Sequence, residues 1–126
     1  MMKGSVPGKS PVTLFGDKID GRSKYIAIAT RNGLGITIIS NDKYQAVDTK
    51  ENVHGMIINS MKGFGNFLFS CDYAGKVVKC EMMEGKLKEI TSVSTNAGCA
   101  NCIEVVNDKI VYVGSTDGTV KRINFN

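Results

Sequence analysis

The sequence has no tryptophan, one histidine and no long apolar run among its 126 residues. No stretch comes near the 18 consecutive apolar residues of a membrane-spanning helix, so none is predicted. Residues 1–11 lack the apolar core of a secretory signal, and we expect them to form a flexible lead-in. The formal charge is +4, but lysine and arginine form no block that would follow a phosphate backbone, which argues against nucleic acid as a partner.

The four cysteines do not form a pattern typical of a reactive or metal-binding site. Cys99 and Cys102 have the spacing of a redox pair, yet they precede a predicted strand rather than the helix that would stabilise a thiolate. A zinc site needs four ligands, and Cys71, Cys80 and His54 are scattered along the chain. We therefore expect structural thiols, no metal and no cofactor, with metal binding and thiol redox chemistry as the alternatives. Reduced cysteines and the missing signal favour the cytoplasm, with the nucleus as the alternative.

A repeated hairpin pattern organises the sequence. In residues 109–123, two runs rich in valine and isoleucine flank the turn at Asp117 and Gly118, as in a β-hairpin. Similar hairpins surround Gly33 and Gly75, so the three turn glycines lie 42 and 43 residues apart. Residues 43–47 and 86–90 form a second marker with a spacing of 43. Two markers with one period of about 40–45 residues predict four-stranded β-propeller blades.

We expect an all-β chain of three consecutive antiparallel sheets over about residues 12–51, 52–96 and 97–126. The first two sheets should have four strands, and the third should lack its outer strand. In the second repeat, residues 56–58 are predicted as the inner strand and residues 62–65 as a loop. The register of its central hairpin should place Cys71 opposite Lys76 and Cys80 opposite Phe67, so the two thiols do not meet.

Residues 12–126 resemble the WD-repeat family of β-propellers. Residues 114–121 look like the family's segment between its second and third strands. In that alignment the place of the family's Trp-Asp pair is taken by residues 38–39, 80–81 and 123–124, none of which contains tryptophan. A quinoprotein-type propeller, whose repeats also end in a glycine-rich turn and a strand, is the alternative.

The resemblance also bears on the one histidine, because the family has a buried His–Asp hydrogen-bond network. His54 takes the place of the family's histidine, whose aspartate partner falls at position 74, occupied here by Ala74. The third repeat has Asp117 but no matching histidine. The buried His–Asp hydrogen-bond network of the family is therefore expected to be broken in both repeats.

Three blades do not close a ring, because propellers typically have four to eight. We expect the chain to be completed by the remainder of a larger propeller or by another copy of itself. An unclosed arc would otherwise leave sheet faces and strand edges open to aggregation.

The sequence favours a non-catalytic scaffold that binds partner proteins. Each sheet uses its apolar faces to pack on its neighbours, which leaves the loops for partners. Loops between second and third strands should emerge on the same face as loops between successive blades, and tyrosine and arginine in them are typical of interfaces. The expected binding residues are Arg31, Asn32, Glu51, Asn52, His54, Tyr73, Asn96, Thr116 and Asp117. The alternatives are a quinoprotein-like or thiol- or metal-dependent propeller enzyme, and a self-associating lectin-like propeller.

Overall fold

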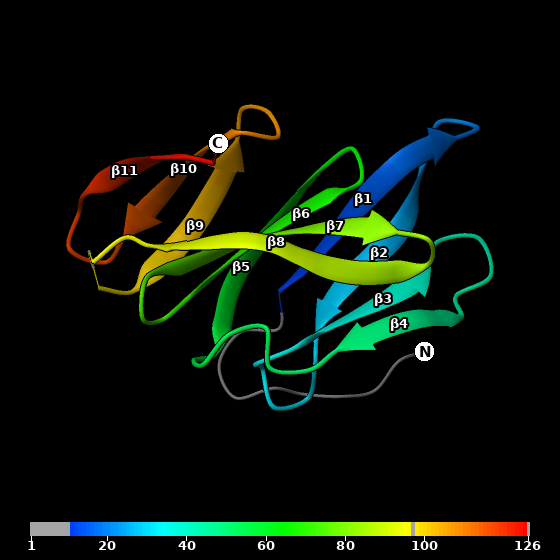
Figure 1. Cartoon of the computed structure of the whole chain (residues 1–126), viewed down its shortest axis with the longest axis horizontal. Coiled ribbons are helices and arrows are strands. Elements are labelled where there is room, and N and C mark those ends of the chain that lie inside the picture. The colour runs from blue at the N-terminus through cyan, green and yellow to red at the C-terminus, as the bar shows by residue number, and fades with distance from the viewer. Residues whose placement is uncertain (1–10, 97, 126) are drawn as a thin grey trace.

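The computed structural model describes residues 11–96 and 98–125, which form eleven β-strands in three antiparallel sheets (Figure 1). Sheet one consists of β1 (Val12–Ile19), β2 (Arg22–Ala29), β3 (Ile36–Ser40) and β4 (Ala46–Lys50). Sheet two consists of β5 (Ile58–Phe64), β6 (Phe67–Asp72), β7 (Lys76–Met83) and β8 (Lys86–Ser94). Sheet three consists of β9 (Ala100–Val105), β10 (Ile110–Ser115) and β11 (Val120–Asn124).

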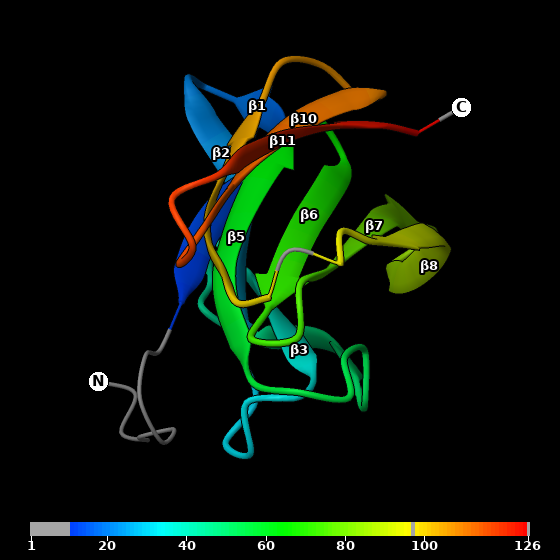
Figure 2. The same ribbon diagram turned by 90° about the vertical axis from the view of Figure 1, so that its left-hand side faces the viewer.

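The strands of each sheet lie side by side in chain order, joined by short connections. The first strands of the three sheets, β1, β5 and β9, are neighbours, and the outer strands β4 and β8 meet on the opposite side. Figure 1 shows sheet two between the other two sheets, and Figure 2 views the molecule from the side of sheet three. The expected all-β architecture, with a three-stranded last sheet, is confirmed for the described residues. Those residues contain no helix, and hence none that could cross a membrane.

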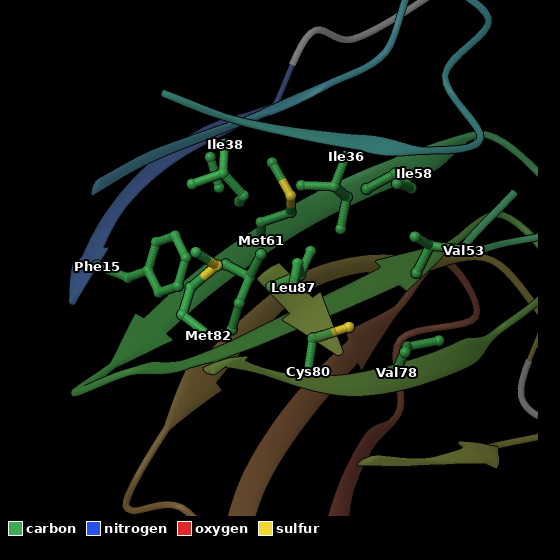
Figure 3. Packing of buried hydrophobic residues seen from close by; sticks show 12 residues of the cluster. Phe15, Ile36, Ile38, Val53, Ile58, Met61, Val78, Cys80, Met82 and Leu87 are labelled. Atoms are coloured by element: carbon green, nitrogen blue, oxygen red, sulfur yellow. The ribbon is translucent and has the colours of Figure 1, made fainter. Parts of the chain in front are cut away.

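Two hydrophobic cores lie between the sheets, and sheet two contributes to both. Neighbouring side chains on a strand point to opposite faces, so Leu68 enters the core shared with sheet one while Phe69 enters the core shared with sheet three. Core one lies between sheets one and two and includes Phe15, Ile36, Ile38, Ile58, Met61, Leu68, Val78, Cys80 and Leu87 (Figure 3). Core two lies between sheets two and three and includes Phe69, Cys71, Val77, Ile103, Val111, Val113, Ile123 and Phe125.

The inner strand of sheet two differs from its prediction. β5 begins at Ile58, and residues 62–64, which were predicted as a loop, belong to the strand. Gly63 explains the error, because glycine is common in loops but serves here for close packing. A Cβ atom at Gly63 would collide with the Cβ atom of Phe15 on sheet one. The turn follows at Gly65, which has a φ of +57°.

The predicted register of the central hairpin is wrong by one residue. Cys71 pairs with Val77 and Cys80 pairs with Leu68. A shift of one residue exchanges the faces on which side chains lie, so the observed register places Cys71 in core two and Cys80 in core one. The predicted alignment of sheet one with sheet two is also wrong by one residue. The sequence aligned Ile38 with Cys80, but strand pairing makes Ile39 the equivalent of Cys80, because the β2–β3 loop has one extra residue.

The turn between the second and third strands has the same geometry in all three sheets. The amide of Gly33 donates to the carbonyl of Thr30 at 2.8 Å. The amides of Gly75 and Gly118 likewise donate to the carbonyls of Asp72 and Ser115, each at 3.1 Å. The glycine φ values are +79°, +85° and +85°, a backbone region that side chains with a Cβ atom rarely adopt.

Gly75 and Gly118 have the same φ but different surroundings, which separates backbone strain from crowding. A Cβ atom at Gly118 would enter open space, whereas one at Gly75 would lie 2.5 Å from the carbonyl oxygen of Gly98. We expect Gly118→Ala to cost on the order of 1–2 kcal/mol from strain alone, and Gly75→Ala to cost clearly more. Urea unfolding of both variants measures the difference. Equal losses of stability would show that the contact between the Gly75 turn and the Gly98 loop is not tight.

Candidate functional site

Five loops gather at one end of the sheets, and we call their described residues the loop end: residues 30–35, 51–57, 73–75, 95–96 with 98–99, and 116–119. Backbone hydrogen bonds join each loop to the next. The amide of His54 donates to the carbonyl of Leu34 at 2.9 Å, and that of Tyr73 donates to the carbonyl of Ile57 at 3.2 Å. The amide of Thr95 donates to Gly75 at 2.9 Å, and that of Thr116 donates to Cys99 at 3.0 Å. The loops therefore form one connected surface.

The structure places eight of the nine predicted binding residues on the surface of the loop end. Tyr73 is 37% exposed. Seven further residues are also exposed: Arg31, Asn32, Glu51, Asn52, Asn96, Thr116 and Asp117. His54 is the exception, since it is only 1% exposed. Its prediction as a surface binding residue is wrong, because its imidazole turns inward to buried polar partners.

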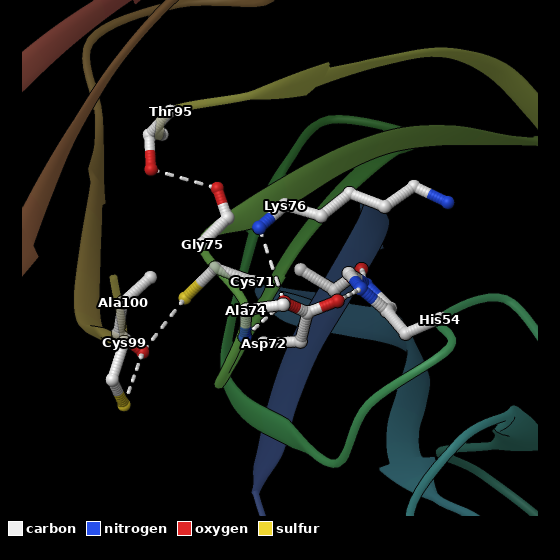
Figure 4. A network of polar contacts seen from close by, with 10 residues as sticks. His54, Cys71, Asp72, Ala74, Gly75, Lys76, Thr95, Cys99 and Ala100 are labelled. Carbon is white, nitrogen blue, oxygen red and sulfur yellow. Dashed lines mark hydrogen bonds and ion pairs between the residues drawn. The ribbon is translucent and has the colours of Figure 1, made fainter. Parts of the chain in front are cut away.

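His54 is the centre of a buried hydrogen-bond network. Its Nδ1 atom lies 2.6 Å from Oδ2 of Asp72, and its Nε2 atom lies 2.7 Å from Oγ of Ser70. The other oxygen of Asp72 accepts hydrogen bonds from the backbone amides of Ala74 at 2.8 Å and Lys76 at 3.0 Å (Figure 4). The network thus ties the β4–β5 connection to the end of β6 and to the following turn.

The expectation that this network is broken is therefore wrong for sheet two. The partner of His54 is Asp72, three residues before the turn glycine, and not the residue at position 74. The sequence did contain a signal for Asp72 as the partner. Each repeat has a polar residue three positions before its turn glycine: Thr30, Asp72 and Ser115. In sheet three, the buried Oγ atom of Ser115 has no hydrogen-bond partner among the described residues.

Hydrogen bonding decides the charge state of Asp72. Burial alone would raise the pKa of its carboxyl group. The hydrogen bond with His54 and those from the amides of Lys76 and Ala74 lower the pKa below its ordinary value of 3.8. Asp72 is consequently ionised at neutral pH.

The Asp72–His54–Ser70 arrangement has the connectivity of a hydrolase triad, in which an aspartate orients a histidine that activates a serine. Ser70 is 0% exposed, and both partners are 1% exposed. A substrate cannot reach the hydroxyl group in this structure. The network therefore acts as a structural clamp on the loop end.

The cysteines divide into two buried and two accessible thiols. Cys71 and Cys80 are buried in different cores, and burial is the main cause that raises the pKa of each to about 12. Cys99 is half-buried and Cys102 is exposed. Within residues 11–96 and 98–125, no three His, Cys, Asp or Glu side chains are arranged to hold a metal ion.

Two surface hollows lie outside the loop end. One, of about 450 Å³, lies between β4 and β8 and is lined by Asp48, Lys50, Lys86 and Glu89 among others. The other, of about 430 Å³, lies at the opposite end of sheet one and is lined by residues such as Arg22, Tyr25 and Asn41. Neither hollow brings together any of the predicted binding residues.

No protein-family model and no curated protein matches this sequence. Solved structures do match it. BamB from Moraxella catarrhalis has a TM-score of 0.67 and 15% sequence identity over 90% of this chain and 32% of that chain. A chain of a mitotic checkpoint complex has a TM-score of 0.69 and 11% identity over 90% of this chain and 35% of that chain. The three sheets are β-propeller blades. The chain spans about a third of the length of each of these two propeller proteins.

The buried network should give this propeller arc a measurable acid sensitivity. Because the pKa of Asp72 is lower in the folded state, its ionised form stabilises the fold above about pH 3.8, and this contribution is lost as the pH falls through the folded value. We expect Asp72→Asn to destabilise the protein at pH 7 by on the order of 3 kcal/mol, and by less in acid. Urea unfolding at both pH values tests this.

Asp117→Asn is the comparison for Asp72→Asn, since Asp117 lies at another turn but is fully exposed. It should cause a smaller loss of stability at pH 7. A loss for Asp72→Asn that stays the same between neutral and acid pH would contradict the assignment of an ionised, buried carboxylate.

The burial of the thiols predicts their reactivity. With a thiol-specific reagent such as DTNB, the native protein should expose two fast-reacting cysteines, Cys99 and Cys102, and the denatured protein all four. Cys71 and Cys80 should stay slow, because burial withholds both access and the thiolate form. Cys99→Ser and Cys102→Ser should each remove one fast thiol. Fast labelling of Cys80 in the native protein would mean that core one opens readily.

Proposed function

We propose that the chain is a non-catalytic protein-interaction module of WD-repeat type, acting in the cytoplasm, whose loop end binds partner proteins. The observation that carries this proposal is the loop end itself. Eight exposed polar, charged and aromatic side chains lie on loops that are joined by hydrogen bonds and anchored by the buried His54 network. Functional residues on loops that a rigid scaffold positions are a common arrangement in binding domains.

The chemistry of the loop end supports a protein partner. It combines the charges of Arg31, Glu51 and Asp117 with the aromatic ring of Tyr73. Met56, which the sequence analysis missed, is 49% exposed in the loop whose Ile57 carbonyl accepts the Tyr73 amide. Tyrosine, arginine and methionine are enriched at protein interfaces. Mixed charge and few apolar groups are less suited to a small apolar ligand.

Two further observations support the WD-repeat assignment and the non-catalytic role. Sheet two has a buried histidine–aspartate hydrogen bond, the type of contact that the resemblance implies for the family, although the aspartate is Asp72 and not the residue at position 74. The same His54 network has the connectivity of a hydrolase triad, and its burial withholds it from substrate.

The test uses two matched pairs of residues at opposite ends of the sheets. Arg31 and Tyr73 belong to the loop end, whereas Arg22 and Tyr44 are exposed at the other end. We expect the double variant Arg31→Ala, Tyr73→Ala to lose most of its partners in quantitative capture experiments. The control variant Arg22→Ala, Tyr44→Ala should retain them. Equal capture by both variants, or loss in the control only, would contradict binding through the loop end.

A further inference from the structure

The first and last sheets each have one uncovered face. We call the side of a sheet that is turned toward the preceding sheet its front face, and the side turned toward the following sheet its back face. The front face of sheet one exposes Val12 by 59% and Leu14 by 55%. The back face of sheet three exposes Val120 by 71% and Tyr112 by 38%. Within the described part of the chain, nothing packs on these side chains as one sheet packs on the next.

The uncovered front face of sheet one has the same residue types as the covered front face of sheet three. Strand register defines the equivalent positions: Val12 pairs with Ile28 and Leu14 with Ile26, as Ile103 pairs with Val113 and Val105 with Val111. Ile39 in turn pairs with Ile26, as Ile123 pairs with Val111. All five positions are aliphatic in both sheets. On sheet one Val12 and Leu14 are exposed, Ile26 and Ile28 are half-buried and Ile39 is buried. In sheet three all five pack against sheet two in core two.

The uncovered back face of sheet three likewise matches the covered back face of sheet two. On sheet two, Phe69 pairs with Lys79, whose Nζ atom lies 4.6 Å from the ring centre of Phe67 and 6.0 Å from that of Phe69. Sheet three covers this pair, and Lys79 is only 7% exposed. The equivalent pair on sheet three is Tyr112 with Arg122, again an aromatic ring opposite a cation, and both are exposed. Val77 has its counterpart in Val120.

We propose that the back face of sheet three packs on the front face of sheet one of a second copy of this chain. The junction repeats the contact between sheets two and three, in which a face with an aromatic–cation pair meets a face of five aliphatic side chains. Two copies make this junction twice and close a ring of six sheets. Three copies would give nine, which lies outside the usual range of about four to eight blades. The association is therefore defined by the packing of these two faces.

The first measurement is the mass of the full chain by light scattering after size-exclusion chromatography. The expected mass is twice the 13.6 kDa of one chain. Leu14→Lys changes only the front face of sheet one, and Val120→Glu changes only the back face of sheet three. Both positions are exposed in the single chain, so both variants should fold, which circular dichroism can check. Each substitution alone should reduce the measured mass to that of one chain. Ile90→Lys is the matched control. Ile90 lies on β8 of sheet two, away from both faces of the proposed junction, and its side chain is 47% exposed. This variant should keep the doubled mass.

Mixing the two monomeric variants tests the direction of the junction. In a ring closed front to back, a Leu14→Lys chain and a Val120→Glu chain form one unaltered junction and one junction with opposite charges. The mixture should therefore recover the doubled mass, whereas neither variant does so alone. A monomeric wild-type chain, a dimer that neither substitution disrupts, an open series of larger species, or a mixture that stays monomeric would each overturn the proposal.

Discussion

The fold depends on the packing of sheet two, which is buried on both faces. On β6 and β7, Leu68 and Val78 face sheet one, while Phe69 and Val77 face sheet three. No other sheet in the described part of the chain has two packed neighbours, so these strands hold the two cores together. Truncating a buried phenylalanine typically costs about 3–5 kcal/mol. The loss of either set of contacts would separate an outer sheet from the rest.

A polar clamp complements these cores at the loop end. Asp72 ends β6, accepts amide hydrogen bonds from the turn that follows, and holds His54 from the β4–β5 connection. A buried charge is tolerated only when hydrogen bonds replace its water, and here they also fix where the loops lie. The exposed residues of the loop end are thus positioned by groups that solvent and partners do not reach. This division of roles separates the residues that shape the surface from those available for recognition.

Much of the architecture could be predicted because its signals are local. The spacing of Gly33, Gly75 and Gly118 follows from the conformation that each turn requires, and a repeated turn implies repeated strands. Strand boundaries were less accessible. Gly63 has the residue type of a loop, but it lies in β5 because the backbone of sheet one passes close by.

The sequence by itself determined the repeat, the all-β class and eight exposed residues of the loop end, because these follow from periodicity and from polar side chains next to turns. Tertiary structure decided the rest. A register shift of one residue, which alternation alone does not fix, assigned Cys71 and Cys80 to different cores. Only the approach of the β4–β5 connection to the end of β6 joined His54 to Asp72, 18 residues apart. The pairing of a buried donor with its acceptor depends on distance in space, which the order of residues along the chain does not contain.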